Sequence, residues 1–256
     1  MTVNNTKRNT LELKPLAPHA FWLNPLALLL LCLAMTGCNL GANQSNIVGR
    51  QAWQNGNQLQ ALSRFQQALN QNPNNPDANY NLAAIFYSMG KQQRNPQYSA
   101  QAEQLYRKAI SLNGEHSEAH RGLTALLVET GREQHAFDLL DGWKQRMPNS
   151  AEPLIEIARL YQEYGDNQHA TDMLADALKV DGSNVRALKA MGNMRESQGQ
   201  SLLALDNYMR VLQLDGSQAD VAQRVAALQQ QYSVNGGAPG QNFTPRYGSA
   251  TPWQTR

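Results

Sequence analysis

Glycine, alanine and large apolar residues recur along the chain at a nearly constant spacing. Glycines stand at steps of 34, 41, 34 and 34 residues: Gly56, Gly90, Gly131, Gly165 and Gly199. An alanine follows each glycine, and a large apolar residue comes four positions later: Ala61 and Phe65, Ala102 and Tyr106, Ala136 and Leu140, Ala170 and Leu174, Ala204 and Tyr208. Self-similarity at a fixed period of this length indicates a repeat architecture.

Each unit predicts two helices joined by a turn. The apolar residues are spaced three or four apart, the glycine marks the turn, and a Pro or Gly such as Pro73 or Gly114 ends the unit. One such hairpin cannot bury its apolar face alone, whereas stacked hairpins share a continuous core. We therefore expect an all-α fold, an α-solenoid of five helix-turn-helix repeats with these boundaries: 42–75, 76–116, 117–150, 151–184 and 185–218.

These positions resemble the tetratricopeptide repeat (TPR), whose 34-residue signature has small residues in the first helix and A-x3-F…P in the second. The resemblance covers residues 42–218 and implies a right-handed superhelix whose first helices line a concave groove. Residues 219–232 carry Val221, Val225 and Leu228 at helical spacing, which predicts a capping helix. Residues 233–256 are rich in Gly, Pro, Ser and Thr, which predicts a disordered tail.

Departures from the repeat carry their own expectations. Seven extra residues near Lys91–Tyr98 should lengthen the turn of the second repeat. Trp143 stands at a small-residue position, which predicts that the third and fourth repeats are wedged apart. Ser45 and Ala52 replace large residues and predict a frayed first helix. The apolar stripe from Leu202 to Leu214 is assigned to the core by its spacing.

The amino-terminal residues predict an export signal. Lys7, Arg8 and Lys14 form a basic start, an apolar run follows, and small residues precede Cys38. The end of this run resembles a bacterial lipobox, which implies that residues 1–37 are a lipoprotein signal peptide, that Cys38 carries the lipid and that 38–44 form a linker. An uncleaved membrane anchor is the alternative. Asn39, where inner-membrane lipoproteins often carry Asp, favours the outer membrane, with the protein facing the periplasm.

Charge argues against nucleic acid as a partner. The formal net charge of +2 comes from the amino-terminal segment, and residues 38–256 hold nineteen basic and nineteen acidic side chains. A nucleic-acid-binding protein is expected to show a basic excess instead. Attachment to a membrane would then depend on lipid chains.

Candidate chemistry is sparse. His116 and His120 stand four apart, but no third ligand follows at metalloprotease spacing, so we expect no metal site. Glu152, Glu156 and Glu163 share a predicted helix and are interpreted as a solvated face rather than an acid–base pair. No phosphate-binding Gly loop or nucleophile motif occurs in the sequence. We therefore expect no cofactor and no enzymatic activity.

The resemblance implies that the groove is the working surface. Mapped onto this sequence, its candidate residues are Tyr80, Asn81, Ala84, Tyr87, Arg121, Ala125, Val128, Ile155, Arg159, Lys189 and Asn193. The cations are expected to pair with carboxylates of a partner, and the tyrosines and Val128 to offer apolar contact. The expected function is an envelope-anchored scaffold or adaptor for a protein partner, in pilus, secretin or outer-membrane protein assembly. A module that binds peptidoglycan or peptides, or a non-catalytic regulator of cell-wall enzymes, is the alternative.

Overall fold

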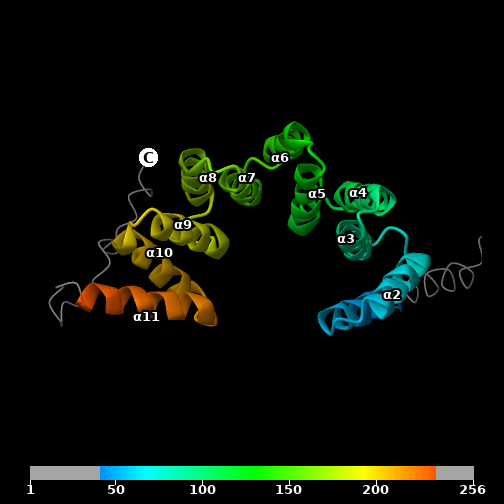
Figure 1. The fold of residues 1–256 in the computed structure, drawn as a ribbon, viewed down its shortest axis with the longest axis horizontal. Coiled ribbons are helices and arrows are strands. Elements are labelled where there is room, and N and C mark those ends of the chain that lie inside the picture. The colour runs from blue at the N-terminus through cyan, green and yellow to red at the C-terminus, as the bar shows by residue number, and fades with distance from the viewer. Residues whose placement is uncertain (1–40, 235–256) are drawn as a thin grey trace, which may run out of the picture.

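The computed structural model describes residues 41–234 as a row of helices, without a strand in that range. A helix over residues 41–54 is followed by these elements: α2 (Gln58–Gln71), α3 (Pro76–Gln93), α4 (Pro96–Leu112), α5 (Ser117–Glu129), α6 (Glu133–Arg146), α7 (Glu152–Glu163), α8 (Asn167–Val180), α9 (Val185–Ser197), α10 (Ser201–Leu214) and α11 (Ala219–Val234). The helices follow one another around an arc (Figure 1). The expected all-α solenoid is thereby confirmed.

Each repeat is a hairpin of a first and a second helix. The first helices are 41–54, α3, α5, α7 and α9, and the second helices are α2, α4, α6, α8 and α10. Each helix packs against the next in the chain, and α3 also contacts α5, α5 contacts α7, and α7 contacts α9. In Figure 1, α3, α5 and α7 lie on the inner side of the arc and α4, α6 and α8 on its outer side. We call the surface formed by the first helices the inner face.

The hairpin turns explain four of the five recurring glycines. Gly56, Gly131, Gly165 and Gly199 have φ between 71° and 75°, a conformation that L side chains rarely adopt. Gly90 instead lies inside α3, and Arg94 has the positive φ of 52° in that repeat. The prediction of a longer turn was therefore wrong. The extra residues extend α3 to 18 residues and α4 to 17, because helix propagation satisfies their backbone groups, and only residues 94–95 remain between them.

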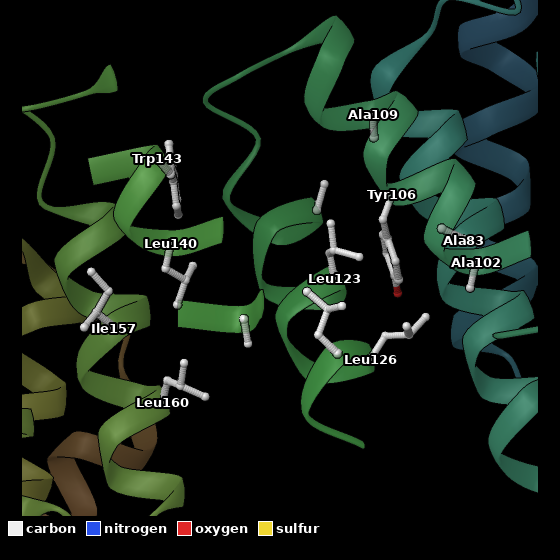
Figure 2. Close-up of a cluster of buried hydrophobic side chains, with 13 residues drawn as sticks. Ala83, Ala102, Tyr106, Ala109, Leu123, Leu126, Leu140, Trp143, Ile157 and Leu160 are labelled. Atoms are coloured by element: carbon white, nitrogen blue, oxygen red, sulfur yellow. The ribbon is translucent and has the colours of Figure 1, made fainter. Parts of the chain in front are cut away.

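The core follows the small and large positions of the repeat. The recurring alanines are fully buried, and Phe65, Tyr106, Leu140, Leu174 and Tyr208 lie against them. Figure 2 shows one such cluster, in which Tyr106, Leu123 and Leu126 lie beside Leu140, Trp143, Ile157 and Leu160. The cluster draws on three consecutive repeats, so each hairpin closes the core of the next.

Two first helices carry a glycine at a point where a buried aromatic ring packs closely against the helix backbone. A Cβ atom on Gly192 would lie 2.5 Å from Cε1 of Tyr208, and one on Gly49 would lie 2.5 Å from Cε1 of Phe65. Both rings are buried in the second helix of the same repeat. A rigid buried ring cannot move aside without disturbing its neighbours, so these positions require glycine.

Replacing Gly192 with Ala should therefore destabilise the protein, although the same change usually favours a helix. We expect the free energy of unfolding to fall by about 2 kcal/mol, because the new methyl group overlaps the Tyr208 ring. Gly142→Ala in α6 is the matched control, since its Cβ would meet only the end of the Arg146 side chain at 3.3 Å. The free energy of unfolding of Gly142→Ala should rise by about 0.5 kcal/mol. Urea unfolding followed by circular dichroism checks both, and equal effects would contradict the packing argument.

Trp143 does not wedge the third and fourth repeats apart. Its side chain is buried and its ring stacks on His120 of α5, with centroids 4.0 Å apart and an interplanar angle of 1°. The indole thus lies within its own hairpin. Ile157 and Leu160 of the fourth repeat remain in the same core cluster. The expectation was wrong because the buried His120 offers a flat partner for the larger ring.

Hydrogen bonds between asparagine side chains hold the amino-terminal hairpin to the next helix. The 41–54 helix buries Ser45 and Asn46, and the Nδ2 of Asn81 donates to the Oδ1 of Asn46 at 2.9 Å. Asn75 likewise donates to Asn43 at 3.0 Å. These bonds replace the missing large side chains, so the expected fraying is not seen. Residues 41–44, at the end of the predicted linker, already belong to this helix.

At the carboxyl end, Val221 and Leu228 of α11 pack into one cluster with Tyr208 and Val211 of α10. The predicted core stripe is only partly buried, because Leu202, Leu203 and Leu214 are 45–50% exposed. No helix among residues 41–234 is long and apolar enough to cross a bilayer. The predicted signal peptide 1–37, Cys38 and tail residues 235–256 lie outside the described residues.

Candidate partner-binding face

The predicted groove residues all belong to first helices. Tyr80, Asn81, Ala84 and Tyr87 lie on α3; Arg121, Ala125 and Val128 on α5; Ile155 and Arg159 on α7; Lys189 and Asn193 on α9. Most of them are partly exposed. Ile155 is the exception, since only 6% of it is exposed and it packs with Ala177 and Ala187. Ile155 is therefore a core residue and not a contact for a partner.

A buried carboxylate organises the centre of the inner face. Glu156 of α7 is fully buried, and its carboxylate accepts hydrogen bonds from arginines of three successive first helices. The Nε of Arg121 lies 3.2 Å from Oε1, the Nε of Arg159 lies 3.0 Å from Oε2, and an Nη of Arg186 lies 2.6 Å from Oε1. The interpretation of Glu156 as part of a solvated face was wrong, because its side chain turns into this arginine cluster.

The neighbouring acidic residues complete the charge balance around these arginines. Arg186 also pairs with Glu152, and Arg159 also pairs with Glu163. Two of the three predicted carboxylate-binding cations, Arg121 and Arg159, are thus already engaged within the protein. The α5, α7 and α9 helices are held together by this network at the inner face.

The third predicted cation is engaged in the same way. The Nζ of Lys189 lies 2.7 Å from Oδ2 of Asp220 in α11 and 3.2 Å from the side-chain oxygen of Gln218. Asn193 accepts a 2.7 Å hydrogen bond from the hydroxyl of Tyr208. Glu196 accepts from Arg224, and its Oε2 lies 2.8 Å from the same hydroxyl, whose single hydrogen is shared between the two acceptors. The inner face along α7, α9 and α11 is therefore lined by internal ion pairs, which also engage Arg121 of α5.

The amino-terminal part of the inner face has a different character. Trp53 is 40% exposed and Arg50 is exposed one turn before it, on the 41–54 helix. Tyr80 and Tyr87 follow on α3, with Ala84 between them, and both rings are partly exposed. The hydroxyl of Tyr87 donates to Glu129 at 2.5 Å. Burial raises the pKa of both tyrosines above the usual value, which keeps the hydroxyls protonated donors.

A pocket of about 240 Å³ adjoins this region. It lies between the end of α3, the start of α4 and the end of α5. Its lining residues are Tyr87, Gly90, Lys91, Arg94, Asn95, Pro96, Ser99, Leu126, Glu129 and Thr130. The inserted residues of the second repeat build its rim, and Tyr87 belongs to both the pocket and the inner face.

Comparisons with known proteins agree with this architecture. A family model described as a TPR repeat matches residues 49–90. A thermophilic TPR protein of Thermus thermophilus is similar over 74% of this chain and 99% of that chain, with 20% identity and a TM-score of 0.57. The Pseudomonas aeruginosa protein pilF is similar over 79% of this chain and 95% of its own, with 17% identity and a TM-score of 0.50. A search among curated proteins returned no match. The chain folds as a TPR solenoid.

The two candidate histidines have structural roles in this TPR solenoid. His116 is the N-cap of α5, where its Nδ1 accepts from the backbone N–H of Ala119 at 3.3 Å. His120 is fully buried against Trp143, and its Nε2 lies 3.1 Å from the carbonyl oxygen of Gly114. Within residues 41–234, no group of three His, Cys, Asp or Glu side chains is placed to hold a metal ion.

The paired residues that the sequence analysis missed follow one simple spacing. Arg186 lies 34 residues after Glu152, Glu156 lies 35 after Arg121, and Asn81 lies 35 after Asn46. In a solenoid with a 34-residue period, such residues lie side by side on adjacent first helices. Opposite charges at this separation would have indicated that the predicted groove cations were already neutralised.

Proposed function

We propose that this protein is a scaffold that binds a segment or helix of a partner protein along its inner face. The observation that carries the proposal is the curved surface of successive first helices, with aromatic side chains and a pocket at its amino-terminal end. Recognition of a peptide or helix by a preformed groove needs little rearrangement of the scaffold. The TPR fold is generally that of a non-catalytic interaction module, which agrees with the proposal.

We further propose that lipid on Cys38 anchors the scaffold in a bacterial cell envelope. The lipobox-like sequence before Cys38 supports the anchor, and Asn39 favours the outer membrane. Since residue 41 already belongs to a helix, at most Asn39 and Leu40 would separate the lipidated residue from it. The amino-terminal repeat would then lie close to the bilayer.

Cys38→Ala should release the protein from the membrane. The variant removes the thiol that would carry the lipid, so we expect no incorporation of a labelled fatty acid and a shift from the membrane to the soluble fraction after cell disruption. Firm anchoring needs more than one lipid chain, and this variant would carry none at residue 38, so the shift should be nearly complete. Cys32→Ala, in the predicted signal, is the control. Incorporation of the labelled fatty acid into Cys38→Ala at the level of the unchanged protein would rule out this anchor.

Assembly of pilus, secretin or outer-membrane protein complexes is the process that we propose for the scaffold. A photoreactive amino acid at Ala84, on the inner face, should give adducts with components of such machinery in living cells. The same group at Gln104, exposed on the second helix α4, is the matched control. Equal adducts from both positions would contradict binding along the inner face, and adducts with peptidoglycan alone would favour the ligand-binding alternative.

A further inference from the structure

We propose that the partner is bound by the amino-terminal half of the inner face alone, and that the bound segment is acidic and carries one apolar anchor side chain. We define this half by the 41–54 helix, α3, the start of α4, and α5. The inference rests on the proposed function, because it names the place and the chemistry of the same interaction.

The carboxyl-terminal half is closed to a partner by its own ion pairs. Lys189 with Asp220, Arg224 with Glu196, and the arginines around Glu156 each join neighbouring first helices or the cap. A partner carboxylate would have to displace an internal one, and at Glu156, the buried member of these pairs, losing a partner leaves an uncompensated charge. The gain from a new pair there would be offset by the loss of the old one.

The amino-terminal half offers unoccupied apolar surface instead. Trp53 is 40% exposed, and Tyr80 and Tyr87 are partly exposed, as are the small residues Ala84 of α3 and Ala125 of α5. Trp and Tyr are the residue types that most often dominate binding energy at protein interfaces.

The charges of this half favour an acidic segment. Arg50 and Arg94 have no ion pair among the residues that the structure describes, and both are exposed. Glu129, the carboxylate that lines the pocket, is already engaged, because it accepts from Tyr87 and pairs with Lys91 at 3.6 Å. Within the described range, these two guanidinium groups therefore remain available, and each can bind a carboxylate through two parallel hydrogen bonds.

The pocket supplies the place for the anchor. Its volume of about 240 Å³ suits one large apolar side chain, and Tyr87, Pro96 and Leu126 give it apolar walls. Arg94 stands among the lining residues, so a carboxylate next to the anchor would meet a cation. The inserted residues that build this rim occur only in the second repeat, which makes the pocket a feature of this half.

A library of short random peptides, selected on the purified full chain, tests the inference. We expect enrichment of peptides in which Asp or Glu stands next to an aromatic or aliphatic residue. Binding of a selected peptide, measured by fluorescence anisotropy, should weaken about tenfold or more in Trp53→Ala and in the double variant Arg50→Gln, Arg94→Gln. Lys189→Gln should bind as the unchanged protein does. All substituted side chains except Lys189 are exposed, and thermal unfolding verifies that each variant is folded.

The outcomes separate this inference from the proposed function. Selected peptides that are basic, or whose binding depends on Lys189 and not on Trp53, would overturn the inference and leave a scaffold that binds elsewhere on the inner face. If no peptide is enriched and crosslinks from Ala84 are also absent, both proposals fail.

Discussion

Glu156→Gln should destabilise the protein by about 3 to 5 kcal/mol, the range for removing one partner of a buried ion pair. The glutamine keeps the size of the side chain but loses the charge. Arg121, Arg159 and Arg186 would then converge on a neutral amide at distances of 2.6 to 3.2 Å. One amide N–H₂ would also face a guanidinium donor, so a hydrogen bond is replaced by a repulsion.

Glu163→Gln is the matched control for that prediction. Among residues 41–234, Glu163 pairs only with Arg159, and its side chain is 41% exposed, so its loss should cost less than about 1 kcal/mol. Urea unfolding gives both free energies, and hydrogen exchange should show the loss of protection concentrated in α5, α7 and α9. Equal small effects of the two substitutions would mean that the arginine cluster does not need the Glu156 carboxylate.

The repeat pattern determines the architecture because small residues decide where helices approach each other. Gly192 against Tyr208, and the buried alanines of the second helices, could be predicted from the spacing alone. The consequence of the seven-residue insertion could not. Extra residues can lengthen a turn or extend two helices, and their sequence does not decide between these outcomes. Glycine at position 90 suggested a turn there, but the residue with the positive φ is Arg94.

The sequence predicted which helices form the inner face, but not that their charged side chains are paired within the protein. Repeat spacing places Arg121, Arg159 and Lys189 on first helices, and the structure confirms that placement. Their ion pairs join residues of adjacent helical repeats or of the cap, so the pattern within a single repeat does not predict them. The exposed Arg94 was overlooked as a site because it lies in the insertion of the second repeat, at no position that the family motif marks for binding.

Stability should fall on acidification because His120 is buried in its neutral form. The pKa of His120 is lowered from 6.5 to about 4, mainly by burial; the hydrogen bond to Gly114 opposes the shift, and nearby Arg146 and His116 contribute to it. Between these pH values the unfolded chain binds the proton and the folded protein does not. The contribution of His120 to stability is thus fully present above pH 6.5 and is lost as the pH falls toward 4, by about 3 kcal/mol in total.

His120→Phe isolates this effect, since it keeps a flat ring against Trp143 but cannot be protonated. Its absolute stability will differ, because the bond to the Gly114 carbonyl is lost. The informative quantity is the slope of unfolding free energy against pH, measured by urea unfolding from about pH 7 down to about pH 4. Over that window the unchanged protein should lose more stability than His120→Phe does. Parallel slopes would show that His120 becomes protonated without leaving its stack on Trp143.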